Sequence, residues 1–331
     1  MERAELTDGD WELIRTFLPV GRFGPYPERL RQQFEGVIWR FRTGSQWRDV
    51  PPLFGAWQTV YNRFAQWRDA GVFEGLLDAA ITEAARRGQA DLSLVSVDST
   101  VVRAHHDAAG TRVRDEVLAS LERAAGKTKR GRRRGRKAQA PAKTDQADVR
   151  QQERRRVRRR RRSRLKAARL GRSRGGLTSK VHLAADRRCR PLAFELTEGQ
   201  AADSPRFIPV LDKVKVRGPV GRPRTRPGAV AGDMAYSSRA NRTYLRKRKI
   251  KAVIPEKADQ AANRKRKGHR GGRPVFHDAQ LYRERNTVER CINKIKAWRG
   301  LATRYDKTPE SYLAGLHLRG AVIWLRSLRP A

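Results

Sequence analysis

An arginine-rich segment divides this chain and limits what it can fold into. Residues 127–172 contain 22 Lys and Arg against 3 Asp and Glu, a balance of +19 over 46 residues. The wider stretch 107–176 is also low in apolar side chains. A segment of this composition cannot bury enough apolar surface to offset its loss of conformational entropy. We therefore predict that it is disordered, or helical only when bound to DNA, and that the folded parts lie on either side of it.

The excess of positive charge extends beyond this segment. The 331-residue chain has a formal net charge of +41 and a pI near 11.5. Self-repulsion on that scale destabilises a compact chain unless a polyanion is present, so we expect a nucleic-acid partner. We expect no membrane partner, because the sequence has no apolar run of 18 residues and MERAELTDGD carries acids where a signal peptide needs bases. For the arginine-rich segment, the alternative to DNA binding is that its charged side chains are simply solvated and have no specific partner.

Cysteine usage indicates the compartment. The two cysteines, Cys189 and Cys291, do not have a zinc-binding spacing. This pattern favours a reducing, cytoplasmic environment and argues against structural zinc or a disulfide framework.

The first 90 residues have the periodicity of helices and are predicted to form a helical domain. Apolar side chains at three- and four-residue spacing predict helices over about residues 11–18, 28–41, 57–67 and 72–86. Gln58, Asn62 and Arg63 fall on the polar face of the third helix. A helix-turn-helix DNA reader fits this order, and a plain helical bundle with an aromatic core fits the spacing equally well.

Beyond this region the pattern changes to that of buried strands. Within SLVSVDSTVV an apolar, β-branched run ends on Asp98, and GAVAGD is a second short run that ends on Asp233. TSKVHLAAD and RPLAFELTE predict a hairpin around DRRCR. Mixed strands and helices in this order predict an α+β core made of residues 91–111 and 173–331, with residues 112–172 as an insertion.

A charged stripe marks the predicted helix over residues 279–298. On one helix its members fall within an arc of about 80°. The stripe consists of Tyr282, Arg285, Glu289, Ile292 and Lys296. A solvated face with i,i+4 ion pairs is the ordinary explanation of such a stripe, but the rest of this helix is polar as well. Cys291 lies roughly opposite Glu289, which favours a packing role for it.

The spacing Tyr-x2-Arg-x3-Glu-x6-Lys resembles the signature of the insertion-sequence-four group of DDE transposases. Longer stretches resemble the neighbouring insertion-sequence-five family: LTDGDWELI, FRTGSQWRDVPPLFGAWQTVYNRFAQW, VSVDSTVVRAH, GRSRGGLTSKVHLAAD, PLAFELTEGQAADS, GDMAYSS and RNTVERCINKIKAWRGLATRYDK. The resemblance covers nearly the whole chain except about residues 112–170.

This resemblance implies a fold and a chemistry. It implies a ribonuclease-H-like core with Asp98 on the first strand, Asp233 on the fourth and Glu289 on the following helix. These three carboxylates would bind two Mg²⁺ or Mn²⁺ ions, which stabilise both oxygens of an in-line phosphoryl displacement. Water would be the first nucleophile, and the released 3′-OH the second.

The resemblance also implies the partners. Tyr282, Arg285 and Lys296 would bind DNA phosphates near the scissile bond, and Trp298 would either stack on an unpaired base or pack at the helix end. The expected partners are double-stranded transposon ends and target DNA, with a homodimer in the end-paired complex.

The sequence allows more than one interpretation of two features. His105 and His106 invite a metal interpretation, but adjacent strand residues point to opposite sides, so DNA or solvent contacts are the better prediction. The alternatives to an active enzyme are an inactive transposase-derived DNA-binding repressor and an arginine-rich RNA-binding protein.

Overall fold

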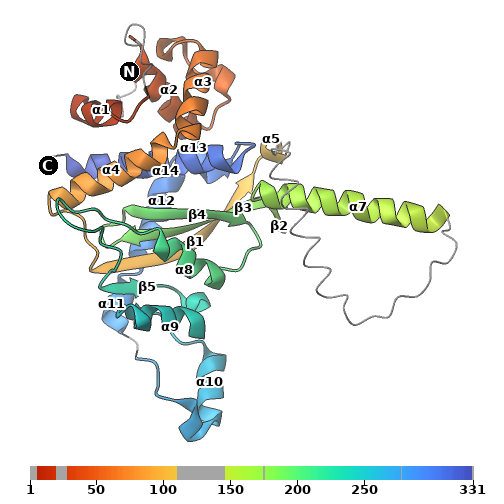
Figure 1. Cartoon of the computed structure of the whole chain (residues 1–331), viewed down its shortest axis with the longest axis vertical. Coiled ribbons are helices and arrows are strands. Elements are labelled where there is room, and N and C mark those ends of the chain that lie inside the picture. Colours follow the sequence, from red (N-terminus) through yellow and green to blue (C-terminus); the bar gives the residue numbers. More distant parts are fainter. Residues whose placement is uncertain (1–5, 20–27, 110–145, 174–175, 277, 330–331) are drawn as a thin grey trace.

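The computed structural model describes residues 6–19, 28–109, 146–173, 176–276 and 278–329 (Figure 1). Its centre is a mixed sheet in which β1 (Leu94–Ala104), β3 (Gly176–Asp186) and β4 (Pro191–Glu198) are antiparallel. β5 (Ala229–Ala231) pairs parallel with β1, and β6 (Lys251–Val253) pairs parallel with β5.

The order of the sheet identifies the fold. The main strands run β4-β3-β1-β5-β6, which is the ribonuclease-H-like order of three antiparallel strands followed by two parallel ones. Two short strands extend it: β2 (Gly171–Ser173) pairs with the start of β3, and β7 (Thr303–Arg304) pairs with the end of β1. The predicted α+β core and its hairpin are confirmed.

Helices cover both faces of the sheet. The Ser96 side chain points to one face of the sheet, where its hydroxyl accepts a hydrogen bond from the hydroxyl of Thr287 on α12 (Asn286–Lys296). α14 (Pro309–Leu328) lies on the same face, where the Trp324 indole donates to the Pro191 carbonyl. Because side chains alternate along a strand, Ser99 points to the other face, toward Asp203 and α8 (Phe207–Asp212).

The predicted N-terminal helices are present. They are α1 (Asp8–Arg15), α2 (Leu30–Thr43), α3 (Trp57–Asp69) and α4 (Val72–Arg86). Residues 44–56 join α2 to α3 through η1 (Trp47–Asp49) and η2 (Pro52–Phe54), so the connection of this pair is longer than the 3–4-residue turn of a helix-turn-helix. α4 packs along α14, and one continuous buried cluster joins these helices to the sheet.

Several shorter helices are found among the described residues. They are α5 (His106–Ala109), η3 (Ser204–Arg206), η4 (Met234–Tyr236), α9 (Arg239–Lys247), α10 (Ala258–Arg266), η5 (Gly268–Gly271), α11 (Ala279–Arg283) and α13 (Arg299–Ala302). Among the described residues, no helix combines the length and apolarity that a bilayer crossing needs.

Three predictions about local structure are corrected. β1 runs on to Ala104, so Asp98 lies within the strand and not at its end. The helix predicted over residues 279–298 is two helices, α11 and α12, with a break at Glu284 and Arg285. The second half of the arginine-rich segment forms α7 (Gln146–Ala167), where we expected no structure without DNA. Residues 112–145 of the predicted insertion lie outside the described residues.

Candidate active site

The carboxylates of Asp98 and Glu289 both pair with the guanidinium group of Arg285. The Arg285 guanidinium donates to Asp98 Oδ2 at 3.2 Å and to Glu289 Oε1 at 2.6 Å. Asp98 comes from β1, Glu289 from the first turns of α12, and Arg285 from the break before α12. The fold therefore brings together two carboxylates that are 191 positions apart in the chain, around one positively charged group.

Asp233 lies within electrostatic range of the same place. It follows β5, and its side chain accepts the backbone N–H of Ala235 at 2.9 Å, which caps η4. Burial raises the pKa of Asp98, and the negative charges of Asp233 and Glu289 raise it further. The Ser99 backbone N–H and the Arg285 charge act in the opposite direction. Two further acidic groups that destabilise the negative charge of Asp98 mark a place that favours a cation.

The donor set fits hard divalent cations. Asp98, Asp233 and Glu289 offer only carboxylate oxygens, which are the ligands that Mg²⁺ and Mn²⁺ prefer. Arg285 already occupies a cationic position between two of them. These residues do not form a group within 4.8 Å of one another here, so they would hold divalent ions only once the Arg285 side chain has moved and the three carboxylates have closed around the ions.

The break before α12 decides which side chains reach the site. The buried face of α12 consists of Thr287, Val288, Cys291 and Ile295. Glu289 stands beside this face, and its side chain is 48% exposed. Cys291 is fully buried, and burial raises the pKa of its thiol, so its predicted packing role is confirmed.

Tyr282 and Lys296 flank the acidic residues. Tyr282 packs against the small cluster of Leu94, Ala229, Ala231 and Val253, with the Arg285 guanidinium carbon 5.8 Å from its ring centroid. Lys296 donates to the Val101 carbonyl on β1 at 3.4 Å, and burial lowers its pKa. Both side chains are partly exposed.

The prediction that Trp298 could stack on a base is wrong. Trp298 is 2% exposed, and the Arg319 guanidinium carbon lies 4.8 Å from its ring centroid. It belongs to the core that joins α12, α13 and α14, as the packing alternative required. The sequence alone could not decide between stacking on a base and packing in the core, because the decision depends on which side of the helix end other segments of the protein cover.

The candidate DNA-reading residues of α3 are accessible. Gln58 and Asn62 are exposed and Arg63 is partly exposed, while Val60, Phe64 and Trp67 form the buried face. The exposed pair is one helical turn apart, so both side chains can approach the same ligand.

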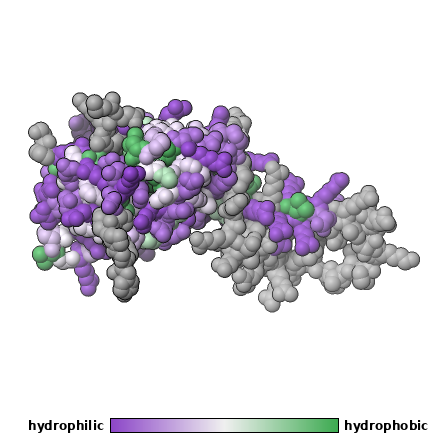
Figure 2. Space-filling model, turned by 90° about the horizontal axis from the view of Figure 1, so that it is seen from above, coloured by the Kyte–Doolittle hydropathy of each residue, from purple (hydrophilic) through white to green (hydrophobic). Residues whose placement is uncertain are grey.

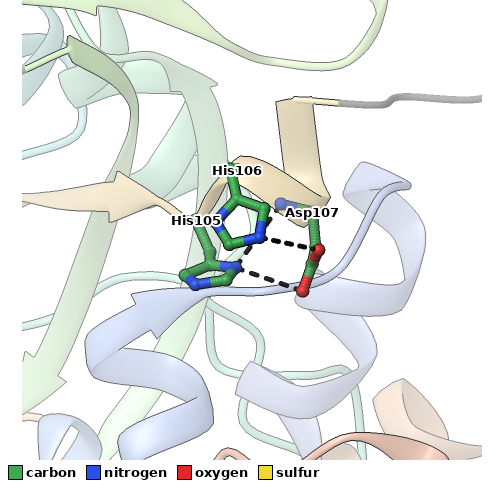
Figure 3. A group of neighbouring side chains, drawn as sticks. All are labelled: His105, His106 and Asp107. Carbon is green, nitrogen blue, oxygen red and sulfur yellow. Dashed lines mark hydrogen bonds and ion pairs between the residues drawn. The ribbon is translucent and has the colours of Figure 1, made fainter.

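The prediction that the side chains of His105 and His106 point to opposite sides is wrong. The strand ends at Ala104, and both rings turn toward Asp107 at the start of α5 (Figure 3). His105 Nδ1 is 3.1 Å and His106 Nε2 is 3.3 Å from the Asp107 carboxylate, and the three groups lie close enough to hold a metal ion. His106 is largely exposed, and the contacts with Asp107 explain the arrangement without an ion.

One group of residues was missed by sequence reasoning. Asp203 accepts the Ser99 hydroxyl at 2.7 Å and the Lys180 ammonium at 3.0 Å. His182 lies 3.7 Å from Asp203 and bonds Thr197 Oγ1 at 2.8 Å, and burial lowers its pKa to about 4. This network fixes β1 immediately beside Asp98. The sequence did contain one sign of this network: the Asp of GQAADS follows the predicted hairpin and has no role in it.

Comparisons with known proteins show the family of this chain. A family model described as "Transposase DDE domain" matches residues 89–316, and one described as "Putative transposase of IS4/5 family" matches residues 6–77. "Uncharacterized protein y4sN" of Sinorhizobium fredii is 38% identical over 109 residues, which are 32% of this chain and 82% of that protein.

Two named relatives are more distant. "Putative transposase for insertion sequence element IS6501" of Brucella ovis is 29% identical over 150 residues, 45% of this chain and 100% of that protein. "Putative transposase for insertion sequence element IS402" of Burkholderia cepacia is 29% identical over 154 residues, 46% of this chain and 65% of that protein. Because the DDE-domain match spans more than half of the chain and includes its whole sheet, the chain belongs to the transposase DDE domain family.

Proposed function

We propose that this chain is an active transposase that binds the terminal inverted repeats of its insertion sequence, hydrolyses each end and joins the 3′-OH to target DNA. The observation that supports this most is the Arg285 guanidinium shared by Asp98 and Glu289, with the Asp233 charge beside them. We assign Asp98, Asp233 and Glu289 as ligands of two Mg²⁺ or Mn²⁺ ions. When bound, such a pair stabilises the attacking and leaving oxygens of a phosphodiester in line.

The cationic side chains would hold the DNA backbone. Arg285 lies next to the carboxylates, so once released it can bind the phosphate beside the scissile bond with two parallel N–H donors. Lys296 and Tyr282 lie on either side and would contact neighbouring phosphates. Water and then the 3′-OH are the nucleophiles, so no covalent intermediate with a protein side chain is needed. A homodimer would hold the two ends together.

The test of this function is cleavage of a labelled duplex that carries one end of the element. We expect purified protein to nick that duplex at the end in Mg²⁺ or Mn²⁺, and EDTA to abolish the nick. A duplex with a scrambled end is the control for sequence preference. A protein that binds the end tightly but never nicks it in either ion would instead be a repressor.

We assign the choice of end sequence to the exposed face of α3. Replacing Gln58 and Asn62 by Ala should lower the preference for the end over random DNA by about tenfold or more, since one good amide–base contact discriminates by about 1–3 kcal/mol. Competition binding with both duplexes measures this ratio. Asn263→Ala, an exposed amide on α10, is the matched control. An unchanged ratio in the double variant would place the specificity elsewhere.

A further inference from the structure

α7 projects from the core as an exposed basic arm. The helix runs from Gln146 to Ala167 and stands clear of the sheet and of the other helices (Figure 1). Every side chain described from Glu153 to Arg160 is exposed. Hydrophilic residues dominate the described surface of the arm (Figure 2). The described part of the protein leaves this stretch of the helix exposed, so its surface is accessible to a partner.

The base of the arm is fixed. Arg304, which is fully buried, donates to the Ala168 carbonyl at 2.9 Å, and the Ser179 hydroxyl donates to the Arg169 carbonyl at 2.7 Å. Ala168 and Leu170 are buried, and β2 then joins the sheet beside β3. The arm therefore leaves the core at a fixed place and is not a loose tail.

Basic side chains surround the arm. At 100° per residue, the described basic positions leave no gap wider than about 80° around the helix. These positions are Arg154, Arg155, Arg156, Arg158, Arg159, Arg160, Arg162, Arg164 and Lys166. Like charges at i,i+4 destabilise a helix in water, so a ligand that stabilises this one must carry negative charge on more than one side of it.

We propose that α7 is an arm that lies in the major groove of target DNA, with phosphates of both strands on its two sides. This rests on the proposed function. The groove is about 12 Å wide and an α-helix is about 10–12 Å across, so a helix fits between the two walls of phosphates. The stretch from Arg154 to Arg164 is about 15 Å long, short enough to stay in a groove that turns once in about 34 Å.

Target DNA suits this arm better than the transposon ends. From Arg154 to Arg164 the side chains are Arg apart from Val157 and Ser163, and arginine–phosphate contacts carry no sequence information. Under the proposed function the ends must be recognised by their sequence, which such contacts cannot do, whereas they are sufficient to hold a second duplex, the target. Double-stranded RNA is not expected, since the deep, narrow major groove of its A-form does not admit side chains.

Two stripes on opposite sides of the arm give a matched test. Arg154, Arg158 and Arg162 form one stripe, and Arg156, Arg160 and Arg164 form the other, about 200° away. Each stripe is replaced by Gln, which has nearly the same helix propensity as Arg. Lys265, Lys267 and Arg270, exposed on and after α10, are replaced by Gln as the charge-matched control. Circular dichroism verifies the helix content of each variant.

The readouts are binding of full-length protein to random duplex DNA as a function of salt, end nicking, and strand transfer of pre-cleaved ends into a plasmid. We expect each stripe variant to lower the slope of log affinity against log salt by about 2 to 3, from about 0.9 per phosphate contact, and to lose strand transfer tenfold or more. End nicking should change less than twofold, and the control variant should keep strand transfer.

Three results would overturn the proposal. Loss of DNA binding and strand transfer in only one of the two stripe variants would mean that the arm contacts its partner through one side of the helix, and not inside a groove. Equal loss in the α10 control would mean that total charge alone matters. Tighter binding of wild type to an RNA duplex than to DNA, lost in both stripe variants, would mean that RNA is the partner. The binding readout needs no catalysis, so an inactive enzyme would contradict the proposed function and leave this test intact.

Discussion

Glu289→Gln is expected to abolish end nicking and strand transfer while the protein folds normally and binds transposon ends at least as tightly. Gln keeps the size and hydrogen-bonding reach of Glu but removes one negative charge from the three-carboxylate site. A divalent ion held by two carboxylates instead of three is bound poorly, so the rate of nicking should fall by orders of magnitude. Nicking of a labelled end duplex and gel-shift binding measure the two effects separately.

The alternative for Glu289 predicts a far smaller effect. Its side chain is about half exposed and pairs with Arg285 four residues earlier. If that pair were its only contribution, its loss would cost about 0.2–0.5 kcal/mol of stability and leave the reaction unchanged. Glu310→Gln, in the first turn of α14, is a control for the charge change away from the site.

Arg190→Met is expected to lower the free energy of unfolding by about 3–5 kcal/mol, because it leaves the fully buried Asp186 carboxylate without its positively charged partner and with backbone N–H donors alone. Arg190 closes the β3–β4 hairpin through Asp186 at 2.5 Å and the Gln89 carbonyl at 2.6 Å. Its guanidinium carbon also lies 3.8 Å from the Trp324 ring centroid. Urea unfolding followed by tryptophan fluorescence measures the change.

Arg187→Met is the matched control for this prediction. Arg187 lies on the same turn and pairs with Glu284 at 2.6 Å, but its side chain is 43% exposed, so its loss should cost about 1 kcal/mol or less. Equal losses for the two variants would contradict a structural role of the buried pair. The double variant Asp186→Leu/Arg190→Met should recover part of the stability, because no charge is then left buried.

The strands and helices were predictable where the pattern of burial is strict. Apolar β-branched runs identified β1 and β5, and the pair of runs around DRRCR identified β3 and β4, because each strand is buried in the sheet. The bounds of β1 were not predictable. From Asp98 to Ala104 the strand carries a carboxylate and other polar side chains, and a search for buried apolar runs does not recognise such a sequence as a strand.

The membership of the candidate site stays a prediction from the sequence, and its arrangement could not be predicted. Three carboxylates at the right places pointed to Asp98, Asp233 and Glu289, but nothing in the sequence indicated that Arg285 would pair with two of them. The break before α12 also escaped periodicity, since Glu284 and Arg285 continue the polar pattern. Asp203 and Trp298 depend on contacts between distant segments, which a single sequence does not reveal.

The central claim is that Asp98, Asp233 and Glu289 act as one metal-binding site for phosphodiester cleavage. Its most direct test is the single-turnover nicking rate of an end duplex in Mg²⁺, measured for wild type, Asp98→Asn, Asp233→Asn and Glu289→Gln at equal saturation with DNA. The predicted result is a metal-dependent nick in wild type and a loss of at least a hundredfold in each variant, with end binding retained. A wild-type nick that persists in EDTA, or any one of the three variants cutting at the wild-type rate, would contradict the claim.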